Sequence, residues 1–384
     1  MDGAARTADI KPFYVMELLA RARALEADGR DIVHMEIGEP DFPTSQPVLA
    51  AAQAAIAQGD IHYTPAVGLV SLRRAIAAFY AQRYGVSVGA DRVVVTPGAS
   101  GALLLTLATL VNPGEYVLLA DPGYPCNRNF VRLLEGQTQS VPVYADTGYQ
   151  LTAELVETHW TSNTRAVLLA TPANPTGTVV RRDELKRISD HVLAQGGSLI
   201  VDEIYHGLIY DGEDFTALAL SDQLFVINSF SKYFGMTGWR IGWVIAPEQY
   251  VSQLDKLAQN LFLAAPTVSQ YAAVAAFAPE NIAILESRRA EFQQRRDYLL
   301  PALRELGFDI PLRPQGAFYI YAGCRRFSSD SYAFALDLLE GAGVAITPGI
   351  DFGDNEPNTH VRFAYTTSIE RLREGVRRLA AYLK

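Results

Sequence analysis

The segment Leu224-Phe225-Val226-Ile227-Asn228-Ser229-Phe230-Ser231-Lys232 puts a lysine shortly after a run of four apolar residues. A short apolar run bounded by polar residues is typical of a buried strand. A lysine at the end of such a strand is costly unless its amine is paired, neutral or covalently engaged. Only five lysines occur, and the other four lie in charged or polar stretches or at the chain ends (Lys11, Lys186, Lys256, Lys384). Lys232 is therefore either a packed lysine whose amine reaches water or a covalent catalytic group.

The apolar run is one of five that alternate with amphipathic stretches. The runs are Val93–Thr96, Tyr116–Ala120, Ala166–Ala170, Ser198–Val201 and Leu224–Ile227, and the stretches between them include Ala102–Leu110, Asn127–Leu134 and Arg182–Leu193. This alternation predicts an α/β domain with a mainly parallel sheet. Trp239–Ala246 follows a tight connection, and we expect it to run antiparallel to the other strands.

The last hundred residues have a different character. A long charged helix is expected at Glu286–Leu306, short strands at Ala317–Tyr321 and His360–Ala364, and a terminal helix at Ser368–Leu383. This pattern predicts a smaller α+β domain. We divide the chain into an N-terminal arm that packs with the small domain (1–45), a large α/β domain (46–280) and the small C-terminal domain (281–384).

Composition excludes several classes of function. The chain of 384 residues is 49% hydrophobic and 20% charged, as in ordinary globular proteins, and its net charge of −9 argues against a nucleic-acid-binding surface. Two cysteines, Cys126 and Cys324, cannot form a disulfide framework, so we expect reduced thiols in a cytoplasmic protein. The longest apolar stretch, Ala102–Val111, is too short to span a membrane. The six histidines lack metal-site spacing, so no metal is expected.

Polar residues follow each predicted strand, where ligands bind in open α/β sheets. The five segments are Pro97–Gly101, Asp121–Pro125, Thr171–Gly177, Asp202–Tyr205 and Asn228–Lys232. Because the carboxyl ends of parallel strands share one edge of the sheet, these segments predict a single ligand site.

The residue types suggest what that ligand is. Gly98-Ala99-Ser100-Gly101 opens a helix, which suits a phosphate but also a plain turn. Arg240, Ser229 and Ser231 could add donors to a phosphate, although Arg240 alone could be an ordinary ion-pair residue. Asp202 must face a cation or donor: an ion pair, a helix N-terminus or a protonated ring nitrogen. With Lys232 as an amine and Tyr205 and Asn174 as donors, the set fits pyridoxal 5′-phosphate.

The chain resembles the fold-type I, class I/II aminotransferases over nearly its whole length, most of all the bacterial aspartate- or alanine-aminotransferase-like members. The matching motifs are Gly38-Glu39-Pro40-Asp41-Phe42, Tyr63-Thr64-Pro65, Asp121-Pro122-Gly123-Tyr124-Pro125, Asn174-Pro175-Thr176-Gly177, Asp202-Glu203-Ile204-Tyr205, Ser229-Phe230-Ser231-Lys232, Gly238-Trp239-Arg240-Ile241-Gly242 and Val361-Arg362-Phe363. The resemblance implies a large doubly wound domain, a small domain built from both chain ends, and a homodimer with shared active sites.

The resemblance also implies a role for each motif residue. Lys232 would bond the cofactor aldehyde and move the proton of the substrate, and Asp202 would keep the ring nitrogen protonated. Asn174 and Tyr205 would hydrogen-bond the ring oxygen. Tyr124 would stack on the ring, and the phosphate would be bound by Ala99, Ser100, Ser229, Ser231, Arg240 and Tyr63 of the partner subunit. Substrate binding is implied for Asn174 and, at the carboxylate, for Arg362 with the backbone of Gly38.

The function implied is ping-pong transfer of an amino group between an α-amino acid and a 2-oxo acid. Two alternatives stay open: a cysteine-S-conjugate β-lyase with the same cofactor, and a non-catalytic cofactor-binding regulatory module. The stretch Asn260–Gln270 has no cation for a second carboxylate, which favours small or apolar substrates such as alanine. Candidates for contact with the substrate side chain, or for simple core positions, are Phe13, Tyr14, Ile37 and Phe318.

Overall fold

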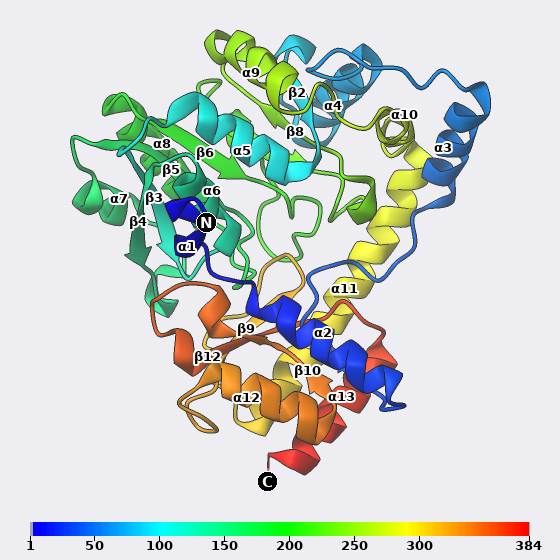
Figure 1. Ribbon diagram of the computed structural model, residues 1–384, viewed down its shortest axis with the longest axis vertical. Helices are drawn as coiled ribbons and strands as arrows, with labels where there is room; N and C mark the ends of the chain where they lie inside the picture. The colour runs from blue at the N-terminus through cyan, green and yellow to red at the C-terminus, as the bar shows by residue number, and fades with distance from the viewer. Residues whose placement is uncertain (1–2, 384) are drawn as a thin grey trace.

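The computed structural model describes residues 3–383 and consists of two parts, each built around its own sheet (Figure 1). Three residues lie outside the described range: Met1 and Asp2 at the start of the first predicted domain, and Lys384 at the end of the last. No helix within residues 3–383 is long and apolar enough to cross a membrane. The exact limits of the predicted domains stay predictions.

The larger part contains a seven-stranded sheet in the order β2-β8-β7-β6-β5-β3-β4. Its strands are β2 (Val93–Thr96), β3 (Tyr116–Asp121), β4 (Gln137–Pro142), β5 (Thr164–Ala170), β6 (Ser198–Asp202), β7 (Phe225–Ser229) and β8 (Gly242–Ile245). Only β8 runs antiparallel to its neighbours, β2 and β7, while the pairs from β7 to β4 are parallel. The predicted α/β class, the five apolar strands and the antiparallel strand are confirmed.

Strand β4 is missing from the sequence prediction, for a physical reason. It lies at the edge of the sheet with β3 as its single partner, and its residues are mostly polar and partly exposed. An edge strand buries little side-chain surface, so its sequence carries no apolar run.

Helices cover both faces of this sheet. The helices of the larger part are α3 (Gln46–Gln58), α4 (Val70–Tyr84), α5 (Gly98–Leu110), α6 (Pro125–Leu133), α7 (Ala153–His159), α8 (Arg182–Ala194), α9 (Glu248–Leu261) and α10 (Thr267–Ala275), of which α3 packs on α10. One buried cluster joins α5, α6 and α9 to one face, and a second joins α4, α7, α8 and α10 to the other. Burial on both faces explains why the central strands are mostly apolar, without a polar residue at every second position.

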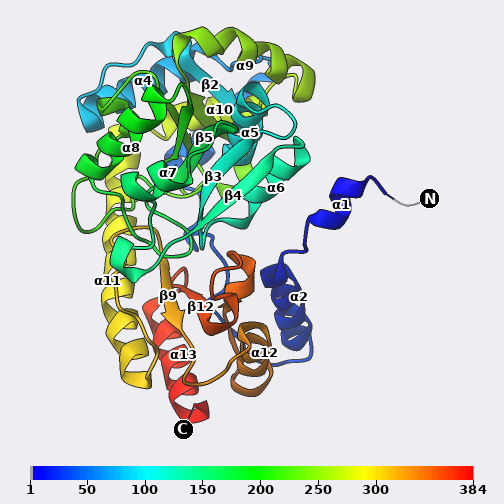
Figure 2. The same cartoon turned by 90° about the vertical axis from the view of Figure 1, so that its left-hand side faces the viewer.

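The smaller part is formed by both ends of the chain (Figure 2). It contains an antiparallel sheet in the order β11 (Thr347–Pro348), β12 (His360–Ala364), β9 (Tyr319–Gly323), and a parallel pair of β1 (Val33–His34) with β10 (Val344–Ala345). Its helices are α2 (Tyr14–Ala27), α12 (Ser331–Asp337) and α13 (Ile369–Tyr382), and α11 (Pro279–Leu306) runs along both parts.

Two details differ from the sequence prediction. Helix α11 begins at Pro279, seven residues before the charged segment that the sequence singled out. Helix α1 (Ala5–Asp9) lies against α6 rather than the small part: Asp9 pairs with Arg132 of α6, and Arg6 pairs with Glu135, just beyond the end of α6.

Candidate active site

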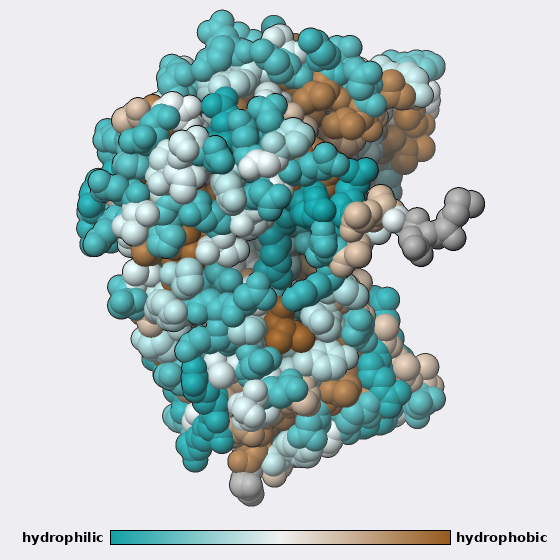
Figure 3. Space-filling model, turned by 60° about the vertical axis from the view of Figure 1, so that its left-hand side comes forward, coloured by the Kyte–Doolittle hydropathy of each residue, from teal (hydrophilic) through white to brown (hydrophobic). Residues whose placement is uncertain are grey.

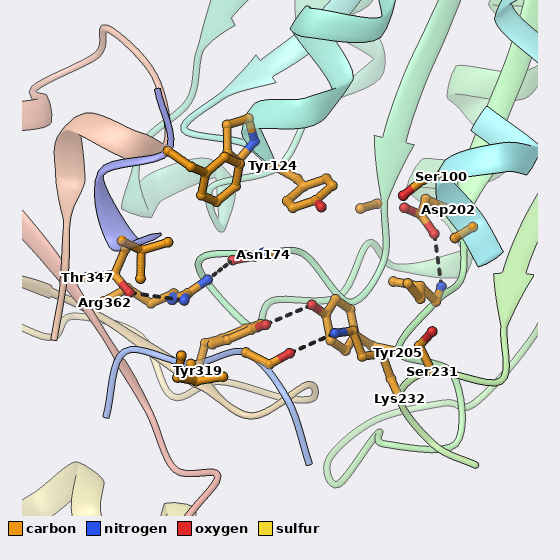
Figure 4. Close-up of a pocket in the computed structure, with 18 of the residues that line it drawn as sticks. Ser100, Tyr124, Asn174, Asp202, Tyr205, Ser231, Lys232, Tyr319, Thr347 and Arg362 are labelled. Carbon is orange, nitrogen blue, oxygen red and sulfur yellow. Dashed lines mark hydrogen bonds between the residues drawn. The ribbon is translucent and has the colours of Figure 1, made fainter. Parts of the chain in front are cut away.

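A cavity of about 280 Å³ lies where the carboxyl ends of the central strands meet the smaller part. Residues that follow β5, β6 and β7 line one side, together with the start of α5. Tyr319, Thr347 and Arg362 of the small sheet line the other side, as Figure 4 shows. The cavity therefore joins segments that are more than two hundred residues apart in the sequence.

Lys232 projects into this cavity from the segment after β7. Its Nζ donates a hydrogen bond to the carbonyl oxygen of Gly38 at 2.7 Å. Burial lowers the pKa of Lys232 to about 8; the charge of Glu39 opposes this shift and that of Arg362 adds to it. A sizeable fraction of the amine is therefore neutral at mildly alkaline pH, as a nucleophile or base requires.

Asp202 is the last residue of β6 and is almost fully buried. Its Oδ1 accepts one hydrogen bond, from the backbone N–H of Ile204 at 3.0 Å. Burial raises the pKa of Asp202 to about 7, against the opposing effects of that hydrogen bond and of Lys232. A cation placed against this carboxylate would hold it ionised, because the protein itself supplies little compensation.

The N-terminus of α5 and the guanidinium of Arg240 lie together at one end of the cavity. Gly98, the first residue of α5, has φ of 73°, and a side-chain carbon there would lie 2.5 Å from Nη2 of Arg240. Ala99 and Ser100 line the cavity beside them. A helix N-terminus and a guanidinium both carry positive charge, so the end of the cavity suits an anion.

Two of the three predicted serines, Ser229 and Ser231, lie at different depths. Ser231 lines the cavity, and its backbone N–H donates to the hydroxyl of Ser229 at 3.1 Å. Ser229 is fully buried behind it, with its hydroxyl 3.0 Å from that of Ser231 and 3.0 Å from the carbonyl of Ile241. Of Ser229 and Ser231, only Ser231 lines the cavity.

Arg362 lies at the opposite end and is held from several directions. Its Nη1 donates to Oδ1 of Asn174 at 2.8 Å, and its Nη2 donates to the carbonyl of Glu36 at 2.7 Å and to Thr347 at 3.0 Å. The rings of Tyr319 and Phe352 lie 4.2 Å and 5.0 Å from its Cζ. The guanidinium is thus fixed in a buried position where a planar, bidentate ligand such as a carboxylate can meet it.

Tyrosines complete the walls, and one predicted tyrosine lies elsewhere. The hydroxyls of Tyr205 and Tyr319 are 2.9 Å apart, and Tyr124 lines the cavity with the edge of Phe13 against its ring. Tyr63 does not line the cavity of its own chain, since its side chain is 82% exposed.

Sequence reasoning missed Tyr319, Thr347 and Phe352. Of the four candidates for substrate contact, Phe13 and Ile37 line the cavity, whereas Tyr14 and Phe318 do not. Phe318, the residue before β9, packs on Phe292, whereas Tyr319, the first residue of β9, faces the cavity. The alternation in Phe318-Tyr319-Ile320-Tyr321 could have indicated two faces, but not which one the cavity occupies.

Comparison with known proteins identifies the family. Residues 30–379 match the family described as aminotransferase class I and II. The chain is 40% identical to a valine–pyruvate aminotransferase of Mycobacterium tuberculosis over 100% of its own length and 99% of that protein. It is 36% identical to a (5-formylfuran-3-yl)methyl phosphate transaminase of Methanocaldococcus jannaschii, over 98% of both chains.

The fold gives the same answer. A crystal structure of an aminotransferase from Mycobacterium tuberculosis superimposes with a TM-score of 0.96 at 39% identity, covering 100% of this chain and 99% of that one. By sequence and by fold, the chain belongs to the class I and II aminotransferases, enzymes that move an amino group between an amino acid and a 2-oxo acid.

Proposed function

We propose that this chain is a pyridoxal-phosphate-dependent transaminase that transfers the amino group of a small or apolar α-amino acid to a 2-oxo acid in a ping-pong reaction. One observation carries the proposal: Lys232, Asp202 and Arg362 line a single cavity whose far end suits an anion. An amine, a buried acid and a carboxylate-binding guanidinium are the groups that this chemistry needs.

The residues present fit the cofactor. The phosphate suits the start of α5 and Arg240, where positive charge gathers, with Ala99, Ser100 and Ser231 as neighbours and Ser229 fixing Ser231. A protonated ring nitrogen suits Asp202, whose carboxylate has a single backbone donor. Tyr124 would lie on the ring face, with Tyr205 and Asn174 at the ring oxygen. The Oδ1 of Asn174 accepts from Arg362, which turns its amide N–H groups toward a ligand.

When bound, the cofactor supplies an electron sink for negative charge at the substrate Cα. Lys232 would carry the proton: its neutral Nζ takes the proton from the substrate Cα and delivers it to C4′ of the cofactor. A pKa of about 8 suits both directions, because the amine is neither always charged nor always neutral near that pH.

The substrate end of the cavity supports an uncharged side chain. Arg362 would bind the α-carboxylate together with the backbone of Gly38. The cations that line the cavity, within residues 3–383, are Lys232, Arg240 and Arg362, and each already has a role. The apolar residues of the wall include Phe13, Val15, Met16, Ile37 and Phe352. A relative named for valine and pyruvate supports the same substrate class.

We also propose a homodimer with shared active sites. Tyr63 and Ile61 have exposed apolar side chains. So do Leu261, the last residue of α9, and Leu263, two residues beyond it. Figure 3 shows hydrophobic surface gathered on the upper part of the molecule. Exposed apolar area of this kind favours contact with a second copy, which would bring Tyr63 of the partner subunit to the phosphate. A cytoplasmic location likewise stays a proposal.

Replacement of the lysine tests the function. Protein purified with the cofactor should absorb visible light, and borohydride reduction should attach the cofactor permanently to Lys232. Lys232→Ala should lose transamination while keeping much of its cofactor through the anion-binding end of the cavity. Lys256→Ala, which changes an exposed lysine of α9, is the matched control. Attachment of the cofactor to another lysine, or turnover by Lys232→Ala, would overturn the assignment. A panel of amino donors with pyruvate and 2-oxoglutarate would define the substrate.

A further inference from the structure

Tyr319 touches three parts of the site at once. It is the first residue of β9 and is buried, with 1% of its surface exposed. Its hydroxyl is 2.9 Å from that of Tyr205, and its ring lies 4.2 Å from Cζ of Arg362. It also lies against Gly38, where a side-chain carbon would come within 2.2 Å of the hydroxyl oxygen.

We propose that Tyr319 is a positioning residue that aligns the donor to the cofactor ring oxygen with the clamp for the substrate carboxylate. Its hydroxyl orients Tyr205, and its ring orients Arg362. The inference rests on the proposed roles of Tyr205 and Arg362 and adds a residue that couples them.

The hydroxyl acts through the direction of a proton. Tyr205 has one O–H proton, so it can donate to a ligand only if it does not donate that proton to Tyr319. Tyr319 is the partner at hydrogen-bond distance from that hydroxyl. With Tyr319 donating, the proton of Tyr205 is free to point into the cavity, and a donor that itself accepts a hydrogen bond is a stronger donor. Gly38 makes room for this arrangement.

The ring acts on the plane of the guanidinium. Tyr319 and Phe352 flank Arg362 at 4.2 Å and 5.0 Å from its Cζ. Stacking fixes the tilt of the guanidinium, while Asn174, Thr347 and the carbonyl of Glu36 fix its rotation. A bidentate carboxylate contact needs both the tilt and the rotation of the guanidinium to be fixed, since the two N–H groups must lie in the plane of the carboxylate.

Two substitutions separate the two actions. Tyr319→Phe removes only the hydroxyl, and Tyr319→Leu removes hydroxyl and ring. Tyr321→Phe is the matched control, because Tyr321 lies two residues along β9 and its buried hydroxyl has no hydrogen-bond partner among the described residues. Two readouts are needed besides turnover: the pH midpoint of the visible absorption of the bound cofactor, and the Kd of isovalerate, a branched carboxylate without an amino group.

The expected results differ for each variant. Tyr319→Phe weakens donation to the negatively charged ring oxygen, so the cofactor keeps its proton to higher pH and the midpoint rises by about 0.3 to 1 pH unit. The Kd of isovalerate in this variant should stay within about twofold, because the stacked ring remains. Tyr319→Leu should raise the midpoint similarly and also weaken isovalerate about tenfold. Tyr321→Phe should change neither quantity.

Each contrary result is informative. An unchanged midpoint in Tyr319→Phe, or unchanged isovalerate binding in Tyr319→Leu, would overturn the inference while the proposed function stands. Wild-type protein that takes up no cofactor would overturn the proposed function first. If Tyr319→Leu does not fold, Tyr319→Met replaces it, because a flexible side chain of similar length fills the space. Gly38→Ala should reproduce the raised midpoint, since its methyl group displaces the hydroxyl.

Discussion

Asp202 is almost fully buried and accepts a single backbone hydrogen bond, and at the scale of one residue this makes the site sensitive to the loss of its charge. Burial raises the pKa of Asp202 to about 7. A cation that faces this carboxylate would interact with it strongly, because the site is shielded from water. Asp202→Asn keeps the shape and removes the charge. We expect turnover to fall on the order of 10³-fold, with cofactor binding weakened much less.

Steady-state kinetics and cofactor titration of the same preparation measure the two effects. Asp190→Asn, which breaks a surface pair with Lys186, is the control for loss of an aspartate charge. Near wild-type turnover in Asp202→Asn would refute the assigned role.

Arg362 supports a second prediction at this scale. It is held by Asn174, Thr347 and the carbonyl of Glu36, and lysine cannot make these contacts with one point charge. Arg362→Lys should lower kcat/KM for every amino acid by a similar factor, about 2–4 kcal/mol of transition-state binding. Selectivity among side chains should change little, because all substrates share the α-carboxylate.

A donor panel compared between wild type and Arg362→Lys tests this expectation. Arg304→Lys, which loses hydrogen bonds to the carbonyl of Ile310 away from the cavity, is the control. Selective loss of aspartate and glutamate would instead make Arg362 the residue for a second carboxylate.

At the scale of elements, the start of α5 and the loop that bears Arg240 must fit closely. Gly98 has φ of 73° and no space for a side chain beside Arg240. Gly98→Ala therefore adds backbone strain and pushes the guanidinium away, and we expect cofactor affinity to fall about tenfold or more. Equilibrium titration with pyridoxal 5′-phosphate measures the loss.

Gly114→Ala separates the two causes. Gly114 has φ of 82°, but nothing lies within 4 Å of the position of an added side-chain carbon. This variant should lose about 1 kcal/mol of stability and keep its cofactor affinity. Equal affinity loss in both variants would show that strain alone, and not displacement of Arg240, weakens binding.

At the scale of the whole molecule, contact with a second copy of the chain would explain why Tyr63 is exposed. If it completes the neighbouring site, mixed dimers of Lys232→Ala and Tyr63→Ala subunits contain one intact site. Random mixing should then restore about a quarter of wild-type activity, because half of the dimers are hybrids with one of two sites intact. Each variant incubated alone is the control. A fully active monomer, or verified hybrids without activity, would contradict the shared site.

The sequence by itself determined the alternation of strands and helices and the polar segments that end the strands. Each is a local property: apolar runs such as Leu224–Ile227 must be buried on both faces, and glycines such as Gly98 mark the turns. The motifs at Lys232, Asp202, Asn174, Arg240 and Arg362 identified the family, which the comparisons confirm. The polar edge strand β4 was not predicted, because its exposed residues lack the apolar run that marks a buried strand.

Only the tertiary structure decided which face of the small sheet meets the cavity. A period of two tells which residues share a face but not where that face points, so Phe318 was chosen and Tyr319 missed. The tertiary structure also decided that Ser229 lies behind Ser231 and that Thr347 and the carbonyl of Glu36 hold Arg362. Depth and backbone contacts arise from packing between distant segments, and no single stretch of sequence encodes them.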